Sequence, residues 1–254
     1  MPRVHPTAVI DPRAELADDV EIGPYAIVDG AVEVADGCIL HAHAIVRGPA
    51  SLGPRCVVHS FAVVGGAPQD RLYNGIPART VAGEGNVFRE HSTVHGGTEG
   101  RTTRLGSDNL VMVGAHIGHD AQIGSHCVLS NSVQIAGHAV VEDYVTFGGL
   151  SGIAQCRRVG EVAFVAAAAV CERDVPPFVV VQGDRARVRT ANVVGLRRRG
   201  VPEESVAALE RAVRRLWSRR TTMAEGLAAL ASDEDEYVRR LVAWLVARDG
   251  SWRV

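Results

Sequence analysis

Several histidines and one carboxylate lie close together near the middle of the sequence. His116, His119 and Asp120 fall within five residues, and Gly137 and His138 follow further along. A histidine beside a carboxylate is a common general base, because the imidazole titrates near neutral pH and the carboxylate can orient it. A backbone N–H beside such a base can stabilise an oxyanion. These residue types predict acyl transfer.

The spacing of these residues favours one shared site. His119, Gly137 and Gln155 are separated by eighteen residues each, which is one complete turn of the fold predicted below, so they should form a vertical column. Isolated outward histidines are usually ordinary surface residues. The group of His116, His119 and His138 differs, because the eighteen-residue spacing brings its members together.

A metal site is the competing interpretation of the same residues. Three histidines on a β-helix can hold zinc, as in the γ-class carbonic anhydrases. Those enzymes have four residues between their close histidine pair, whereas two residues separate His116 from His119. Asp120 is better suited to orienting an imidazole than to joining a ligand set. We therefore expect neither a metal nor another cofactor.

A six-residue repeat determines where these side chains lie. An aliphatic residue recurs at every sixth position from Val4 to Val64, and the repeat returns at residues 82–94 and 105–165. A period of six fits a short strand plus a corner, and three such units close a triangular coil of eighteen residues. Parallel coils stack about 4.8 Å apart, so residues eighteen apart lie above one another. The sequence predicts a mainly β protein, a parallel β-helix of hexapeptide repeats.

Two stretches interrupt the repeat. Residues 65–81 gain glycine, proline and asparagine, and residues 96–104 form a shorter excursion. We expect both to be loops extruded from the β-helix, because those residue types favour turns. Loops on a rigid scaffold commonly carry function.

The pattern becomes helical after Pro177. Helices are predicted from about Pro202 to Arg219 and from about Glu234 to Arg248, where apolar residues recur at helical spacing. We expect a β-helix over residues 1–177 and a helical C-terminal region over residues 178–254. Such a region can cap the last coil, whose strand edges would otherwise be unpaired.

Composition limits the class of protein. The chain has 254 residues, is 46% hydrophobic and carries a net charge of −2, with no apolar run of membrane-spanning length. The repeat begins at Val4, so we expect no signal peptide, no membrane span and a cytoplasmic location. Residues 184–220 hold eleven arginines against four acids, which indicates a local anion site. Cys38, Cys56 and Cys127 fall in the small inward position of the repeat and should be structural thiols.

Longer motifs resemble a specific family, the acyl-carrier-protein-dependent UDP-N-acetylglucosamine O-acyltransferases that open lipid A biosynthesis. The resemblance spans nearly the whole chain and rests on residues 4–8, 69–70, 89–90, 106–110, 115–120, 136–138, 174–177, 182–183, Asn192 and 196–200. It implies left-handed coiling. It also implies a homotrimer with the substrate groove between neighbouring chains, and acyl carrier protein and UDP-N-acetylglucosamine as partners, with no nucleic acid.

The resemblance also assigns roles to individual residues. His119 would be the general base for attack of the sugar 3-hydroxyl on an acyl thioester, Asp120 would hold its other ring nitrogen, and the Gly137 N–H would polarise the thioester carbonyl. Exposed arginines could receive the acidic carrier protein. The residues implied in substrate binding are Asp70, His95, His116, His138, Gln155, Asn192, Arg198 and Arg199, and those implied in measuring acyl length are Ala166 and Ala167.

The chain departs from the family pattern at several positions. Leu72 stands where the family usually has a lysine, Gly96 replaces an arginine, and Ala154 and Cys156 replace a histidine and a phenylalanine. Alanines replace the glycines typical of the acyl-length positions, which predicts a groove shortened by about a methyl group or fitted to another chain. A 3-amino UDP-sugar as acceptor and a catalytically silent β-helix are the remaining alternatives.

Overall fold

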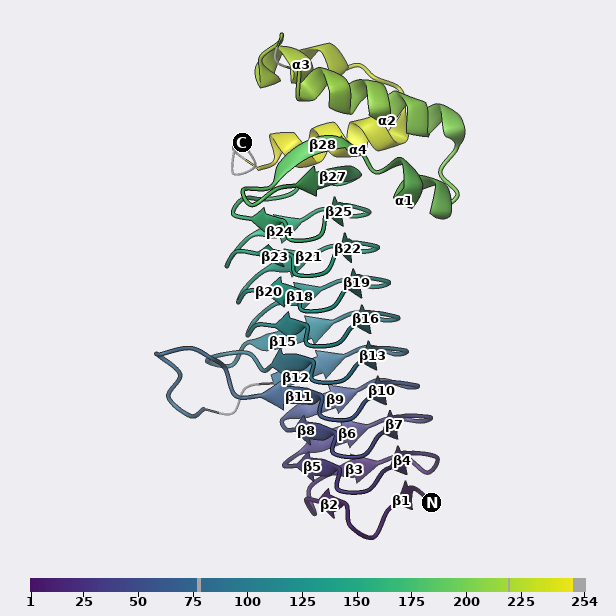
Figure 1. Cartoon of the computed structure of the whole chain (residues 1–254), viewed down its shortest axis with the longest axis vertical. Coiled ribbons are helices and arrows are strands. Elements are labelled where there is room, and N and C mark those ends of the chain that lie inside the picture. Colours follow the sequence, from purple (N-terminus) through teal and green to yellow (C-terminus); the bar gives the residue numbers. More distant parts are fainter. Residues whose placement is uncertain (77–78, 219, 249–254) are drawn as a thin grey trace.

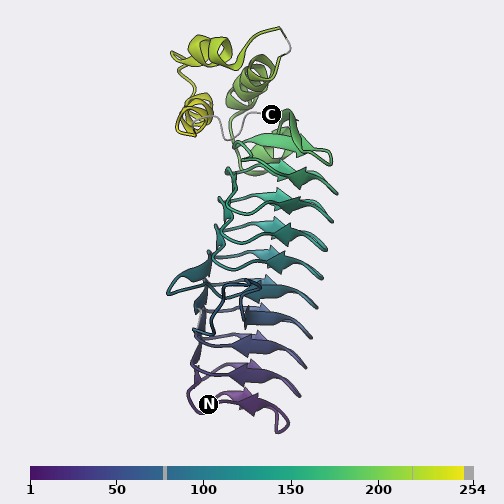
Figure 2. The same cartoon turned by 90° about the vertical axis from the view of Figure 1, so that its left-hand side faces the viewer.

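The chain forms a long triangular prism with helices at its C-terminal end (Figure 1). This computed structural model describes residues 1–76, 79–218 and 220–248. Stacked coils of short strands and tight corners rise from the N-terminus, and both views show the same regular column (Figures 1 and 2). The predicted fold, a left-handed parallel β-helix followed by an α-helical tail, is confirmed.

Three sheets form the sides of the prism, and we call them sheets A, B and C. Sheet A contains β1 (Arg3–Val4), β4 (Glu21–Ile22), β7 (Ile39–Leu40), β10 (Val57–Val58), β13 (Val87–Phe88), β16 (Leu110–Val111), β19 (Val128–Leu129), β22 (Thr146–Phe147), β25 (Phe164–Val165), β27 (Val179–Gln182) and β28 (Arg187–Ala191). Sheet B contains β2 (Val9–Ile10), β5 (Ile27–Asp29), β8 (Ile45–Arg47), β11 (Val63–Gly66), β14 (Thr93–His95), β17 (His116–Ile117), β20 (Gln134–Ile135), β23 (Gly152–Ile153) and β26 (Val170–Cys171). Sheet C contains β3 (Glu15–Leu16), β6 (Val32–Val34), β9 (Ala50–Leu52), β12 (Arg79–Ala82), β15 (Thr102–Leu105), β18 (Gln122–Ile123), β21 (Val140–Val141) and β24 (Arg158–Val159).

The strand register explains how the repeat places side chains. Gln134 pairs with His116 below it and with Gly152 above it, each eighteen residues away. The aliphatic residue that follows each of these points inward and is buried, as for Ile117 and Ile135. Burial of each such side chain contributes about 1.5–3 kcal/mol. The core is therefore one continuous, mainly aliphatic cluster along the prism, in which Phe88 and Phe147 are among the largest side chains, while the alternate residues face outward.

The predicted inward cysteines occupy this core. Cys38, Cys56 and Cys127 are fully buried free thiols. Burial raises the pKa of Cys127 to about 12, so its thiol stays protonated at neutral pH. These thiols act as small apolar groups in the core, as the repeat predicted.

Each corner of the prism contains a residue in the left-handed backbone region. We name the corners A–B, B–C and C–A after the sheets that they join. Asp120, with φ 61°, and His138, with φ 59°, hold this position at successive levels of the B–C corner. Their side chains point away from the core and stack from coil to coil.

Both excursions leave the prism at the B–C corner. The longer one joins β11 to β12 and projects from one side of the column (Figure 1). The shorter one joins β14 to β15 and lies directly below the corner that carries His119. Pro77 and Ala78 of the longer loop lie outside the described residues.

The helical end begins later than residue 178. Strand β27 pairs in parallel with β25, and β28 returns antiparallel to β27, so sheet A continues past the proposed boundary at residue 177. The helices are α1 (Val193–Arg198), α2 (Glu203–Leu216), α3 (Met223–Leu230) and α4 (Glu236–Val246). The short α3 was not predicted, and the predicted helix end at Arg219 and residues 249–254 lie outside the described residues.

The helices cover the last coil (Figures 1 and 2). Arg240 of α4 forms an ion pair with Glu161, and the Trp244 indole N–H donates to Glu142 at 3.3 Å. Helix α2 is amphipathic and buries Leu209, Val213 and other apolar residues against this end. Among the described helices, none has the length and hydropathy of a membrane span.

Candidate active site

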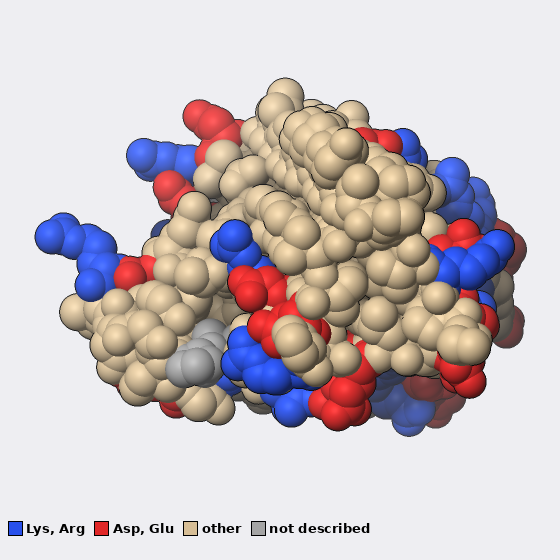
Figure 3. Space-filling model, turned by 90° about the horizontal axis from the view of Figure 1, so that it is seen from below, with Lys and Arg blue, Asp and Glu red and all other residues tan. Residues whose placement is uncertain are grey.

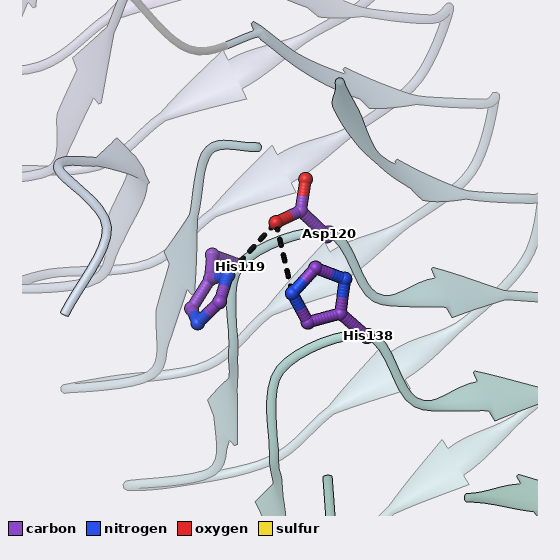
Figure 4. A group of neighbouring side chains, drawn as sticks. All are labelled: His119, Asp120 and His138. Carbon is purple, nitrogen blue, oxygen red and sulfur yellow. Dashed lines mark hydrogen bonds and ion pairs between the residues drawn. The ribbon is translucent and has the colours of Figure 1, made fainter. Parts of the chain in front are cut away.

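His119 and Asp120 form a hydrogen-bonded pair at the B–C corner (Figure 4). The Nδ1 atom of His119 lies 2.8 Å from Oδ2 of Asp120. Both residues are buried, with 8% and 6% of their surface exposed. Burial acts to raise the pKa of Asp120, but hydrogen bonds from His119 and Thr98 outweigh it, and the pKa lies below its usual range. Asp120 is therefore a carboxylate at neutral pH, and an anion accepts the Nδ1 proton of His119.

The shorter excursion holds this carboxylate. The Thr98 backbone N–H donates to Oδ1 of Asp120 at 2.9 Å, and the Thr98 hydroxyl donates to Oδ2 at 2.7 Å. The backbone N–H of Asp120 donates to the Thr103 hydroxyl at 2.8 Å. Both carboxylate oxygens are thus fixed, so the ring that Asp120 orients is also fixed.

His138 lies on the other side of the same carboxylate. Its Nε2 is 3.5 Å from Oδ2 of Asp120, and its ring meets that of His119 edge to face at 5.0 Å (Figure 4). Its Nδ1 lies 3.3 Å from the Arg101 guanidinium. Because arginine only donates hydrogen bonds, Nδ1 is the acceptor and the ring proton is on Nε2, facing Asp120.

Gly137 brings a free backbone donor next to His119. A Cβ added at Gly137 would lie 2.6 Å from Nε2 of His119, so only glycine allows this close approach. Within the described residues, the Gly137 N–H has no hydrogen-bond partner, and neither have the equivalent N–H groups of Val113 and Asn131. At other corners the equivalent N–H is taken, as for Ser107, Ser125 and Glu161, which donate to side chains of a neighbouring coil. Gly137 combines an unpaired N–H with a nearby imidazole.

A groove of about 520 Å³ opens from this corner across sheet B. Its lower part is polar and its upper part is mainly apolar, with Leu150 72% exposed and Val170 44% exposed. The lining residues are Gln69, His95, His116, Gly118, His119, Gln134, Ile135, Ala136, Gly137, Leu150, Ser151, Gly152, Ile153, Ala154, Gln155 and Val170. A ligand with one polar and one apolar end fits such a groove.

Two further histidines of the groove are uncharged at neutral pH. Burial, together with the neighbouring His116 and His119 rings, lowers the pKa of His95 to about 4. Burial and His119 also lower the pKa of His116, whose Nδ1 lies 2.8 Å from the Thr93 hydroxyl. These rings can donate or accept hydrogen bonds there without adding charge.

The structure brings most of the predicted site residues together. His95, His116, His119, Gly137 and Gln155 all line the groove, and His138 contacts Asp120 behind it. Asp70 is one residue from the groove residue Gln69, but its carboxylate caps its own loop by accepting from the Leu72 N–H at 2.9 Å.

Other predicted residues lie apart from the groove of the single chain. Asn192 caps α1 and donates to the Val162 carbonyl at 2.7 Å. Arg198 and Arg199 are exposed at the C–A corner, where the Arg199 guanidinium stacks 3.6 Å from the Tyr144 ring. Ala166 and Ala167 form the A–B corner that leads into β26 and do not line the groove.

His119, Asp120 and His138 could also accommodate a cation. One ligand atom from each of His119, Asp120 and His138 lies within 4.8 Å of the others. However, Nδ1 of His119 and Oδ2 of Asp120 are already joined by a hydrogen bond, as is Oδ2 to the Thr98 hydroxyl. A metal bound to these two atoms would have to replace both bonds. The arrangement favours an oriented base over a ligand set.

Several groups were missed by the sequence interpretation. The excursion was expected to matter, but nothing in its sequence indicated that Thr98 binds Asp120 or that Arg101 reaches His138. The eighteen-residue spacing does identify Val170, which is eighteen residues after Gly152 and thirty-six after Gln134. The same arithmetic that assembled the histidines could therefore have found the apolar wall.

Comparisons with known proteins agree on one family. Residues 174–250 match the family described as UDP N-acetylglucosamine O-acyltransferase, domain 2, and residues 102–137 match the bacterial transferase hexapeptide repeats. The acyl-[acyl-carrier-protein]–UDP-N-acetylglucosamine O-acyltransferase of Paraburkholderia phymatum is 46% identical over 251 residues, which cover 95% of each chain. The enzyme of that name from Burkholderia thailandensis is 47% identical, again over 95% of each chain.

Solved structures give the same result. The UDP-N-acetylglucosamine acyltransferase of Campylobacter jejuni has a TM-score of 0.90 and 33% identity, over 96% of each chain. That of Francisella novicida has a TM-score of 0.90 and 31% identity, over 96% of this chain and 91% of the other. The chain therefore belongs to the family of acyl-[acyl-carrier-protein]–UDP-N-acetylglucosamine O-acyltransferases.

Proposed function

We propose that this protein transfers a fatty acyl chain from acyl carrier protein to the 3-hydroxyl of UDP-N-acetylglucosamine, the first step of lipid A biosynthesis. The acyl chain is a 3-hydroxyacyl group in this proposal. The single observation that carries the proposal is the close approach of His119 Nε2 to Gly137, whose N–H is unpaired among the described residues, in a groove with one polar and one apolar end. Nucleophile activation and oxyanion stabilisation both require groups at that point.

The reaction begins at His119. With Nδ1–H donating to Asp120, Nε2 has a free lone pair and takes the proton of the sugar hydroxyl as its oxygen attacks the thioester carbon. The resulting oxyanion accepts a hydrogen bond from the Gly137 N–H. The tetrahedral intermediate then expels the carrier thiolate, which takes the proton from His119. The acyl group passes directly to the sugar, with no acyl-enzyme.

The electrostatics of the pair support this cycle. An imidazolium forms on His119 in the first step, and the Asp120 carboxylate stabilises it at 2.8 Å. Thr98 keeps this carboxylate ionised and oriented through two hydrogen bonds. The partly buried setting strengthens these interactions relative to water. In this proposal His95, His116 and Gln155, which line the groove, bind substrate there. His138, which faces Asp120 behind the groove, completes the binding site.

We further propose that the active form is a homotrimer. Sheet C carries Glu15, Glu33 and Arg104 on its outer face, whereas sheet A presents aliphatic residues there from Ile39 to Val128. Seen from the N-terminal end, uncharged surface forms a broad ridge and charged residues gather on the remaining sides (Figure 3). Outward aliphatic columns on a soluble β-helix favour contact with another chain.

A closed ring of three copies would also bring site residues that are far apart in one chain close together. If sheet A of one copy packs on sheet B of the next, the C–A corner of the first meets the B–C corner of the second. Arg198 and Arg199 of one copy then lie beside His119 of its neighbour. Two guanidinium groups suit the diphosphate of the sugar nucleotide. This arrangement gives Arg198 and Arg199 a place in the site that they lack in the single chain. Asn192, whose amide caps α1 and bonds to Val162, would support the helix that carries them.

Mixing two inactive variants tests the shared site. His119→Ala and Arg199→Ala chains, each inactive alone, are co-expressed and purified together. Random assembly in a ring leaves both residues intact at about a quarter of the sites, so activity should return to about a quarter of wild type. No recovery in verified mixed trimers would contradict a site shared between copies.

The activity itself is tested with purified protein. The wild type is given a panel of acyl carrier proteins with either UDP-N-acetylglucosamine or its 3-amino analogue. We expect product with the 3-hydroxyl acceptor and release of one carrier thiol for each ester formed. Amide formed much faster on the 3-amino sugar would favour the alternative acceptor, and no acyl transfer to either sugar would contradict the proposal.

The metal interpretation is the second candidate, favoured by the cluster of His119, Asp120 and His138. It is tested by dialysis against a chelator followed by metal analysis and the same assay. The acyl-transfer proposal predicts full activity, because none of its steps uses a Lewis acid. Stoichiometric zinc with loss of activity on its removal would favour the metal site.

We also propose a cytoplasmic location. The exposed thiol of Cys156 and the four buried cysteines are all unpaired, as is usual in a reducing compartment. Cell fractionation with compartment markers tests this location, and recovery in the periplasmic fraction would contradict it.

A further inference from the structure

The C–A corner carries a column of stacked side chains next to helix α1. Asp108, His126 and Tyr144 hold its left-handed position in successive coils, with φ of 55°, 58° and 59°. The His126 and Tyr144 rings are parallel to within 1°, with centroids 4.7 Å apart, and the His126 Nδ1 lies 3.7 Å from Oδ2 of Asp108. The backbone N–H of Tyr144 donates to the Ser125 carbonyl at 2.9 Å. The Tyr144 ring is therefore held both by the ring below it and by its own backbone.

Helix α1 is attached to this corner at both of its ends (Figure 1). At the N-terminal end, the Asn192 side chain donates at 2.7 Å to the carbonyl of Val162, the corner residue one coil above Tyr144. At the C-terminal end, the guanidinium of the capping residue Arg199 stacks on the Tyr144 ring at 3.6 Å. Leu196, which lies between them in the sequence, is fully buried. The corner thus fixes both the helix and the direction of the Arg199 side chain.

The arginines at the end of α1 have different partners. Arg197 forms a bidentate ion pair with Glu203, at 2.7 and 2.8 Å. Among the described residues, no carboxylate pairs with Arg199, and its guanidinium contacts the Tyr144 ring instead. A guanidinium that lies over a ring uses its face, so the N–H groups along its edge stay free to donate. Those N–H groups match the geometry of phosphate oxygens.

We propose that Tyr144 is a positioning residue, which orders the Arg199 guanidinium for the diphosphate of a sugar nucleotide in the site of the neighbouring copy. This inference rests on the proposed function and on the proposed ring of three copies. A free arginine side chain has many rotamers, and fixing one of them on binding lowers the affinity. Tyr144 orders the side chain before the nucleotide binds, so the nucleotide binds more tightly. Tyr144 acts through Arg199, without contact to the substrate.

A double-mutant cycle with Arg199 tests this role. Tyr144→Leu removes the ring, and leucine tolerates the backbone there because Leu150 has the same left-handed conformation, with φ 61°. Calorimetry should show binding of UDP-N-acetylglucosamine weakened about tenfold, because the guanidinium is no longer ordered. In an Arg199→Ala background, the same change should weaken binding by less than about twofold. A loss of equal size in both backgrounds would overturn the inference, because Tyr144 would then act independently of Arg199.

Steady-state kinetics separate positioning from packing. In Tyr144→Leu the KM for the sugar nucleotide should rise about tenfold, while the KM for acyl carrier protein changes by less than about twofold. Tyr144→Phe keeps the ring face and should retain the wild-type KM for the sugar nucleotide. Phe61→Leu is the matched control, because Phe61 also holds a left-handed corner position, with φ 64°, but stacks between the rings of His43 and His91. Both KM values of this control should stay within about twofold of wild type.

The outcomes separate this inference from the proposed function. Unchanged nucleotide binding in Tyr144→Leu, beside a wild type that transfers acyl groups, would overturn the inference and leave the proposed function standing. A wild type that transfers no acyl group to the sugar nucleotide would instead contradict the proposed function, and the inference with it. Thermal unfolding and the molar mass of each variant verify that folded proteins in the same assembly are compared.

Discussion

Two corners of the same prism use histidine in opposite ways. At the A–B corner, Tyr25, His43, Phe61 and His91 stack one above another as parallel rings, with centroids 5.0–5.2 Å apart and planes within 10°. At the B–C corner, the rings of His119 and His138 are also 5.0 Å apart but are nearly perpendicular, at 87°. The coil spacing is the same at both corners.

A carboxylate and a loop account for the difference. Asp120 occupies the left-handed corner position below His138. It is hydrogen-bonded to the His119 ring, and its Oδ2 lies 3.5 Å from Nε2 of His138. The excursion after β14 then covers this carboxylate with Thr98. The A–B ladder has neither a carboxylate between its rings nor a covering loop, and its rings stack and stabilise neighbouring coils. The regular coil spacing places the side chains at both corners, and Asp120 together with the loop that carries Thr98 makes His119 a candidate general base.

The largest effect is expected when the carboxylate is neutralised. Asp120→Asn keeps the size of the side chain and tolerates the left-handed backbone. The asparagine amide has only one acceptor oxygen, so it cannot accept from Thr98 and from His119 Nδ1 as the two carboxylate oxygens do. The imidazole tautomer with its proton on Nδ1, which leaves Nε2 free to act as a base, is then no longer stabilised. Turnover should fall by at least about a hundredfold. Steady-state kinetics at saturating substrate provide the check, and a loss below threefold would contradict the orienting role.

The buried rings near the B–C corner should make stability depend on pH. The folded pKa of His95 is about 4, below the unfolded value of 6.5. The unfolded chain therefore binds the proton first, and stability is lost as pH falls from about 6.5 towards 4. The loss from His95 alone can reach about 3 kcal/mol. Urea unfolding at fixed protein concentration, for wild type and His95→Asn, should give a shallower pH slope in the variant. Equal slopes in the wild type and the variant would exclude His95 as a source of the pH dependence of stability.

Variants of Thr98 distinguish a hydrogen-bonding role toward Asp120 from a role in packing alone. Thr98→Val removes the hydroxyl donor to Asp120 and keeps the backbone N–H donor. Turnover should fall about tenfold, the value of one charge-assisted hydrogen bond. Asp120 then interacts more strongly with the imidazolium of His119, so the acidic limb of the pH–rate profile should move to higher pH. Thr98→Ser should restore both quantities. A fall in rate with an unmoved profile would assign Thr98 a packing role only.

A matched pair of substitutions compares the corners directly. His43 and His138 both occupy the left-handed position, with φ 62° and 59°, which asparagine also tolerates. His138→Asn should lower turnover several-fold because it removes a donor facing Asp120. His43→Asn should change turnover by less than about twofold, since the His43 ring stacks between Tyr25 and Phe61 and does not line the groove. Equal losses in the two variants would remove the distinction between the corners.

The sequence predicted those features that follow from its repeat. The eighteen-residue spacing placed His119, Gly137 and Gln155 in one column, and the breaks in the repeat located both excursions. It could not predict contacts made by irregular backbone, because the path of residues 96–101 depends on which donors meet Asp120 after folding. For the same reason Thr98 and Arg101 were missed.

The tail shows a similar limit. Periodicity located α2 and α4 within a few residues, but α3, with only eight residues, has too few turns for a clear pattern. The C–A corner residues were assigned to the substrate site only through resemblance. Nothing in a single chain brings Arg199 to His119, since that distance depends on how copies assemble.

The central claim is that His119 is the general base of acyl transfer. The most direct measurement compares wild type with His119→Ala in turnover of acyl carrier protein and UDP-N-acetylglucosamine, with binding of the sugar nucleotide followed by calorimetry. The account predicts a fall in turnover of about 10²- to 10⁴-fold with nucleotide binding largely retained. A variant that keeps more than half of wild-type turnover would contradict it and would remove His119 from the mechanism.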